Sequence, residues 1–137
     1  MDSLTAFFTE KAACFATGDL KAAARTLQLP ATVHVGPQKM VLQSFAEVVA
    51  MLRAYRANLK VESYDTSVFT VLHRRMWSKT EFEILLRWTN KNDRGATIST
   101  LTANYTCVLQ DNGTWIVRSV DILSAPKPRL AEGLPLH

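Results

Sequence analysis

The second half of the chain constrains the fold most, because from Val61 onward apolar and polar residues alternate with the period of two that is typical of β-strands. Valine, isoleucine, threonine and aromatic residues are frequent there, and short groups of turn-forming residues interrupt them. The pattern predicts four long strands, over residues 61–73, 79–90, 96–110 and 115–123. The loop 90–95 and the Asn112-Gly113 turn join neighbouring strands, which predicts an antiparallel meander.

The expected sheet has one apolar face. The side chains that share this face are Phe82, Ile84, Leu86 and Trp88 in one strand and Leu101, Ala103, Tyr105, Cys107 and Leu109 in the next. The opposite face is polar, but threonines, Leu85 and Val108 interrupt its charges, so we expect a second copy of the chain to cover part of it. The apolar face needs a cover of its own, which we assign to the first half of the chain.

That first half has the period of helices. Apolar residues recur at spacings of three and four from Leu4 to Phe15, and Gly18 is expected to end this helix. Asp19 then caps a second, shorter helix. We expect it to reach Leu27, after which a proline prevents its continuation.

A short hairpin and a third helix follow. Residues 31–35 and 39–42 alternate with a period of two, and a Gly-Pro turn joins them. Ser44 and Glu47 have the spacing of a capping box, in which the hydroxyl and the carboxylate each accept a hydrogen bond from a free backbone N–H. Three cations lie off the apolar stripe of this helix and are expected to face solvent: Arg53, Arg56 and Lys60.

Together these patterns predict an α+β fold in which a curved antiparallel sheet wraps around three N-terminal helices. One domain is expected over residues 1–123, because 137 residues with 47% hydrophobic composition suffice for one core and leave no room for a second. Residues 124–137 contain three prolines and one glycine and predict an extended C-terminal tail.

Charge and composition narrow the classes of partner. The formal net charge of +4 falls short of a nucleic-acid-binding footprint, and basic residues near Trp77 are expected at a hairpin end, where such residues are common. The N-terminus carries Asp2, Glu10 and Lys11, so it does not resemble a secretory signal, and no run of about eighteen apolar residues occurs. We therefore expect a cytoplasmic protein that binds neither nucleic acid nor membrane.

Few residues suit metal or disulfide chemistry. Cys14 and Cys107 each lie within an apolar pattern, which favours two buried thiols over a disulfide. Three histidines without neighbouring ligands do not form a metal-binding cluster, and no phosphate-binding loop or nucleophile motif is present. The sequence therefore predicts no metal and no cofactor.

The order of elements and four short segments resemble the nuclear transport factor 2-like superfamily, over about residues 3–123. The segments are Phe15-Ala-Thr-Gly-Asp-Leu20, Pro30-Ala-Thr-Val33, Ser44-Phe-Ala-Glu47 and Asn112-Gly-Thr-Trp-Ile-Val117. The resemblance implies a cone-shaped, cystatin-like α+β barrel. It also implies a range of functions, because the superfamily includes ketosteroid isomerases, SnoaL-like polyketide cyclases, dehydratases, epoxide hydrolases, and binding or association domains without chemistry.

The resemblance can be extended to the ketosteroid isomerase site, which needs a carboxylate base and an oxyanion hole made by a tyrosine and a protonated acid. Lys11 occupies the position that resembles the family's tyrosine, Val35 that of the base, and Tyr105 that of the acid. The base is absent. An intact ketosteroid isomerase site is therefore not expected.

The remaining candidates are aromatic or titratable. Expected ligand-binding residues in an apolar pocket are Phe15, Tyr55, Trp88 and Tyr105. Candidate catalytic residues are Tyr105 as a donor and Asp121, His34 or His73 as a base. Each of them has a competing interpretation as a core or surface residue.

We therefore expect a small-molecule-binding domain with an apolar pocket, in a homodimer that forms through the sheet face. One alternative is a SnoaL-like cyclase, dehydratase or isomerase that uses the candidate residues above. Another is an association module in which the polar sheet face or the proline-rich tail docks another protein.

Overall fold

The computed structural model describes residues 2–124 and has three helices and a six-stranded sheet. The elements in chain order are α1 (Ser3–Thr17), α2 (Leu20–Ala24), β1 (Leu27–Val35), β2 (Gln38–Leu42), α3 (Phe45–Lys60), β3 (Tyr64–Met76), β4 (Glu81–Asn92), β5 (Thr97–Leu109) and β6 (Trp115–Ser124). The strands lie in the order β2-β1-β6-β5-β4-β3. The expected tail falls outside the described residues beyond its first residue, so its extended form stays a prediction.

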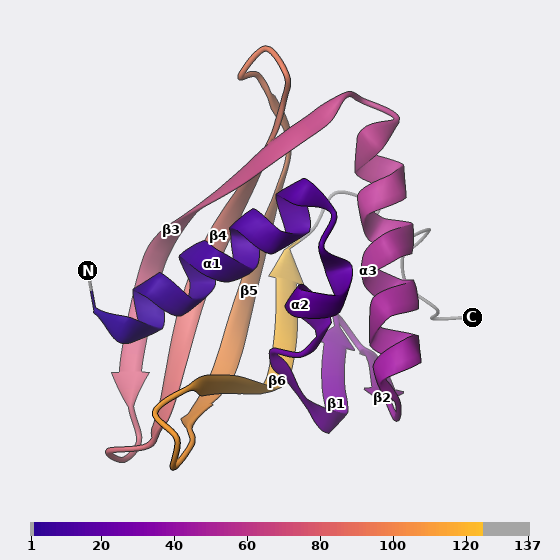
Figure 1. Cartoon of the computed structure of the whole chain (residues 1–137). Coiled ribbons are helices and arrows are strands. Elements are labelled where there is room, and N and C mark those ends of the chain that lie inside the picture. The colour runs from indigo at the N-terminus through magenta and orange to yellow at the C-terminus, as the bar shows by residue number, and fades with distance from the viewer. Residues whose placement is uncertain (1, 125–137) are drawn as a thin grey trace.

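The helices cover one face of a curved sheet. In Figure 1, α1 crosses in front of β3, β4 and β5, while α3 stands beside β1 and β2. The predicted α+β architecture is confirmed, but the sheet is open, with β2 and β3 at its edges, and does not close into a barrel. One pairing is also not antiparallel, because β1 runs parallel to β6. Through this pair, the short hairpin of β1 and β2 joins the sheet beside β6, which is the last strand of the meander.

Several element boundaries differ from the prediction, and the largest shifts are at the end of α2, the start of β1 and both ends of β3. The second helix ends at Ala24 and not at Leu27, because Leu27 already pairs with Val117 of β6, whose N–H donates to the Thr26 carbonyl at 2.7 Å. Strand pairing thus overrides the local helical pattern. The strand predicted over 61–73 spans Tyr64–Met76, since the turn after it is built around a serine and contains neither glycine nor proline.

That serine is Ser78, and its hydroxyl oxygen accepts hydrogen bonds from the backbone N–H groups of Thr80 and Glu81 at 3.2 and 3.1 Å. The Trp77 N–H donates to the Glu81 carbonyl at 2.9 Å and closes the hairpin. Side-chain acceptors of this kind replace glycine and proline in tight turns, and they are harder to recognise in a sequence.

Caps fix the start of each helix. The side chains of Asp2 and Asp19 accept hydrogen bonds from backbone N–H groups in the first turns of α1 and α2. The Glu47 N–H donates to the Ser44 hydroxyl at 3.2 Å, as the capping box predicts. The Glu47 carboxylate accepts instead from the N–H of Gln43, one residue before the cap, at 2.8 Å.

The core lies between α1 and the sheet. Phe8 is fully buried, and its ring centre lies 4.9 Å from that of Tyr105, 6.4 Å from that of Trp88 and 6.3 Å from that of Phe69. These rings belong to three adjacent strands, so one helical side chain fixes the helix across the width of the meander. Tilted and edge-to-face contacts at these distances add about 0.5–1.5 kcal/mol each beyond the area that they bury.

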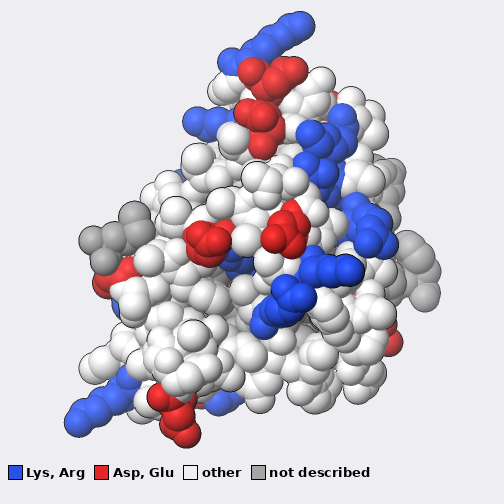
Figure 2. All heavy atoms as spheres, in the orientation of Figure 1, with Lys and Arg blue, Asp and Glu red and all other residues white. Residues whose placement is uncertain are grey.

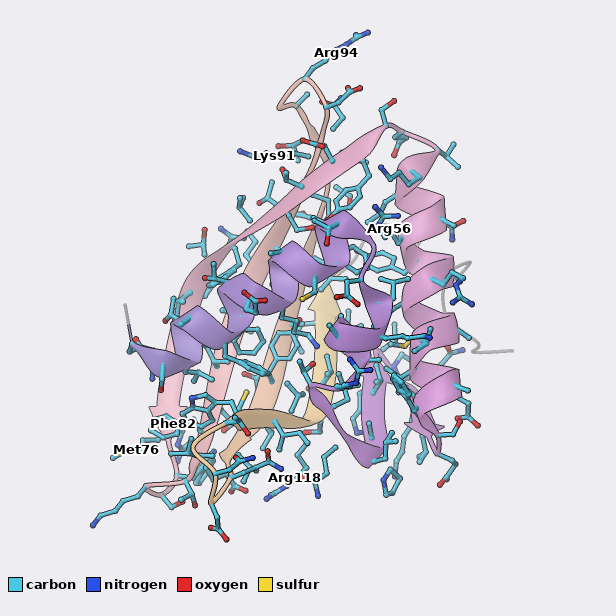
Figure 3. All side chains as sticks on the ribbon, in the orientation of Figure 1. Arg56, Met76, Phe82, Lys91, Arg94 and Arg118 are labelled. Carbon is cyan, nitrogen blue, oxygen red and sulfur yellow. The ribbon has the colours of Figure 1, made fainter. Side chains whose placement is uncertain are left out.

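Arg56 does not face solvent, in contrast to the expectation for the cations of α3. Its side chain points from α3 toward the end of α1 (Figure 3), where Nε donates to the Phe15 carbonyl at 2.9 Å and a terminal nitrogen donates to the Ala16 carbonyl at 2.8 Å. A helix C-terminus has free carbonyls and a partial negative charge, and both attract a guanidinium. Arg53 and Lys60 are exposed, as predicted.

We predict that Arg56→Ala lowers the free energy of unfolding by about 1–2 kcal/mol, because it removes two charge-assisted hydrogen bonds at a partly exposed site. Arg53→Ala is the matched control and should change stability by less than about 0.5 kcal/mol. Urea denaturation followed by circular dichroism measures both. Equal losses in the two variants would show that Arg56 does not tie the helices together.

Candidate functional site

A cavity of about 150 Å³ lies between the helices and the inner face of the sheet. All three helices and five of the strands, all except β2, contribute to its wall. Most of the lining is apolar, and its residues without a polar side-chain atom are Ala12, Phe15, Ala23, Leu27, Val33, Met51, Leu52, Leu101, Val120 and Ile122. The cavity exists beside small side chains, because Ala12 on α1 and Ala23 on α2 leave space that larger residues would fill.

All four residues predicted to bind a ligand line this cavity. Phe15 and Tyr55 approach it from α1 and α3, with ring centres 5.7 Å apart. Trp88 and Tyr105 approach it from neighbouring strands, and the Trp88 indole N–H donates to the Tyr105 hydroxyl at 2.7 Å. The structure thus brings the four aromatic residues together around one hollow.

Tyr105 is a neutral hydrogen-bonding group. Burial among apolar side chains raises the pKa of its hydroxyl well above the usual value of 10, and the hydrogen bond from Trp88 opposes this only in part. The hydroxyl therefore keeps its proton at physiological pH. It can act as a hydrogen-bond donor but not as a base.

A second polar group lies at the cavity wall around Asn90, which is buried. The Ser67 hydroxyl donates to the Asn90 carbonyl oxygen at 2.7 Å, and the Asn90 amide donates to the hydroxyls of Ser99 at 3.2 Å and Tyr55 at 3.3 Å. The Tyr64 hydroxyl lies 2.5 Å from that of Ser67. The network links α3 to three strands and satisfies its buried polar atoms internally.

The cavity wall also contains a lysine, Lys11. The sequence indicated this residue only because it occupies the position that resembles the tyrosine of ketosteroid isomerases. Lys11 lies one turn before Phe15 on α1, and its amine donates to the Thr26 hydroxyl and to the Ala23 carbonyl, 3.5 Å away. Both partners are uncharged. Burial lowers the pKa of Lys11 from 10.5 to about 8, while the nearby thiols of Cys107 and Cys14 oppose this shift more weakly.

The charged side chains on the surface have surroundings that differ from those of the Lys11 amine. Figure 2 shows basic side chains along the right of the helix-covered face, on the side of α3. Acidic side chains lie beside them, near the centre of that face. Such mixed charges are solvated and screened. The Lys11 amine is instead placed among apolar side chains.

The three candidate bases lie away from the cavity. His34 and Asp121 are cross-strand neighbours on β1 and β6, and the residues beside them, Val33 and Val120, line the cavity from the opposite face of the sheet. His73 is exposed on β3. In the described residues, no carboxylate or imidazole lines the cavity.

Residues 2–124 contain no group of three or more His, Cys, Asp or Glu side chains that could hold a metal ion. Both cysteines are free thiols, with Cys107 buried and Cys14 partly buried. Within the same range, no helix is long and apolar enough to cross a membrane.

Three polar residues of the cavity wall were not predicted as site residues from the sequence: Lys11, Ser67 and Asn90. A signal for Lys11 exists, because it precedes Phe15 by four residues and so shares a face of the helix with a residue of the apolar stripe. Ser67 and Asn90 carry no comparable signal, since their pairing depends on the register of β3 and β4.

The comparisons with known proteins agree with this architecture. A model of the NTF2-like protein family DUF6841 matches residues 2–124, so the chain belongs to this family. The predicted nuclear transport factor 2-like resemblance is thereby confirmed. A search of curated proteins gave no match.

Solved structures share the fold at low sequence identity. An NTF2-like protein of unknown function from Shewanella oneidensis is 18% identical, with a TM-score of 0.67 over 88% of this chain and 96% of that one. A ketosteroid isomerase-like protein from Erwinia carotovora is 13% identical, with a TM-score of 0.59 over 89% and 95%. A Xanthomonas campestris protein described as a calcium/calmodulin-dependent protein kinase II association domain is 16% identical, with a TM-score of 0.61 over 90% and 86%. These likenesses establish the fold alone.

We predict that Lys11→Met stabilises the protein at neutral pH, because it removes the cost of burying an ammonium group, and the Thr26 hydroxyl keeps its own bond to the Ala23 carbonyl at 2.7 Å. The gain should shrink as pH rises. Between the folded pKa of about 8 and the unfolded value of 10.5, the unfolded chain retains a proton that the folded wild type has lost, so wild-type stability rises relative to that of the variant.

Thermal unfolding of both proteins from pH 7 to pH 10 measures this difference. Lys21→Met, an exposed position on α2, is the matched control and should give a melting curve that runs parallel to that of the wild type across the range. A constant difference between wild type and Lys11→Met would contradict the assignment of a buried, desolvated amine.

Proposed function

We propose that this chain is a small-molecule-binding domain that takes a compact, largely apolar ligand into its cavity. The observation that carries the proposal is the cavity itself, about 150 Å³ with a mostly apolar wall. Apolar cavities of about this volume accept molecules about as large as benzene. A ligand of matching shape restores dispersion contacts that the side chains around a void lack.

The few polar groups on the wall give such a ligand an orientation. The bond from Trp88 uses a lone pair of the Tyr105 hydroxyl, so the hydroxyl proton is available for a ligand oxygen. Aromatic side chains with a small number of directed polar groups are the usual composition of a small-molecule site.

Binding is better supported than acid–base catalysis. The position that resembles the base of ketosteroid isomerases is Val35, and the other candidate bases, Asp121, His34 and His73, do not line the cavity. Tyr105 stays protonated because of its burial. A cyclase or isomerase that works in this cavity would need a base other than the three candidate bases and Tyr105.

We predict that toluene raises the melting temperature of the wild type and that Ala12→Leu abolishes the effect, because the larger side chain occupies the cavity from α1. Ala13→Leu makes the same change at the next, exposed position of the helix and should retain the effect. Differential scanning calorimetry with and without toluene measures all three proteins. The proposal fails if toluene leaves the wild type unchanged or shifts all three proteins equally.

We also propose that a second copy of the chain covers the outer face of the sheet. Leu85, Asn104 and Asp121 are cross-strand neighbours on β4, β5 and β6, and the first two are partly buried and uncharged. Leu123 extends the apolar part of this face and is 58% exposed. The association domain among the structural neighbours is a protein of the same fold whose description names assembly.

If the outer face forms a dimer, Leu85→Glu should convert it to a monomer, because a carboxylate is then buried without a partner at the centre of the interface. Val61→Glu, placed after α3 at a position that is 82% exposed, is the control and should remain dimeric. Light scattering after size exclusion gives the masses. A monomeric wild type, or a dimeric Leu85→Glu, would rule out this interface.

A further inference from the structure

The cavity contains one cationic group among its lining residues, the amine of Lys11, and the partners that the structure shows for it are both uncharged. The Thr26 hydroxyl accepts one hydrogen bond, and the Ala23 carbonyl accepts another. A lysine ammonium has three N–H donors, so one remains for a group inside the cavity. Part of the Lys11 side chain is accessible, as expected for a residue that borders a hollow.

The surroundings of this amine make its charge costly. Ala12, Leu27 and Val33 are buried apolar neighbours in the same wall. An ammonium placed there loses hydration without gaining an ion pair. An anion that enters the cavity would supply the missing opposite charge in a medium of low dielectric constant, where the attraction is stronger than in water.

The rest of the cavity sets the shape of that anion. A volume of about 150 Å³ admits one ring, and the side chains of Phe15 and Trp88 provide aromatic surface for it. A phosphate or sulfate would leave the apolar wall uncovered, whereas a carboxylate attached to a ring matches both parts. The Tyr105 hydroxyl offers a further donor to a carboxylate oxygen.

We propose that the ligand is a monocyclic carboxylate, with its carboxylate paired to the Lys11 ammonium and its ring in the apolar part of the cavity. The proposal rests on the proposed function and specifies the class of ligand. The amine remains mostly protonated at neutral pH, which favours an ion pair over attack of the amine on a carbonyl group.

Isothermal titration calorimetry with benzoate and with benzyl alcohol tests this directly, because the two molecules share a ring and differ in charge. At about pH 6.5 the wild type should bind benzoate at least about tenfold more tightly than benzyl alcohol. At about pH 9.5 its benzoate affinity should fall about tenfold or more, since Lys11 has lost its proton while benzoate stays ionised. Lys11→Met should lose the preference for benzoate over benzyl alcohol at both pH values.

Lys21→Met, with the same change at an exposed site, should behave as the wild type. Benzoate preference that persists in Lys11→Met, or that does not change with pH in the wild type, would overturn the assignment of Lys11 and leave the proposed function standing. Binding of benzyl alcohol without binding of benzoate would also overturn the assignment of Lys11 and leave the proposed function standing. If the wild type binds neither compound, both the ligand class and the proposed function fail.

Discussion

The aromatic contact between α1 and the sheet is the interaction on which the rest of the structure depends. Phe8 is fully buried, and its ring packs against aromatic rings from β3, β4 and β5, which fixes the helix across the curved sheet. Arg56 ties the far end of the same helix to α3. Because the helix is fixed at Phe8 and at its C-terminal end, while Ala12 and Ala23 are too small to reach across, the space between these contacts stays open.

Much of this fold follows from periodicity and capping. The period of two in the second half predicted the meander, and the Ser44 capping box predicted the start of α3, because both signals are local. Non-local pairing explains the misses. Leu27 belongs to a helical pattern but joins β6, and the parallel direction of that pair is set by how the hairpin docks, which no short stretch of sequence records.

The candidate site was also predictable in part, for the residues that lie on strands. Alternation within each strand placed Trp88 and Tyr105 on the inner face, and it placed His34 opposite Val33, away from the cavity. Lys11 was harder to assign, since a lysine in an amphipathic helix usually extends to solvent. Its burial depends on the neighbouring segment after α2, whose Thr26 hydroxyl and Ala23 carbonyl accept its hydrogen bonds.

The central claim is that an amine without a charged partner lies in the apolar cavity of this NTF2-like fold, and the most direct test is the pKa of that amine. Nuclear magnetic resonance of the Lys11 side chain, labelled with nitrogen-15 and assigned by its absence in Lys11→Met, follows the titration of this one group. The account predicts a midpoint near pH 8. A midpoint at the usual value of 10.5 would show that the amine is hydrated, and the account would then be wrong.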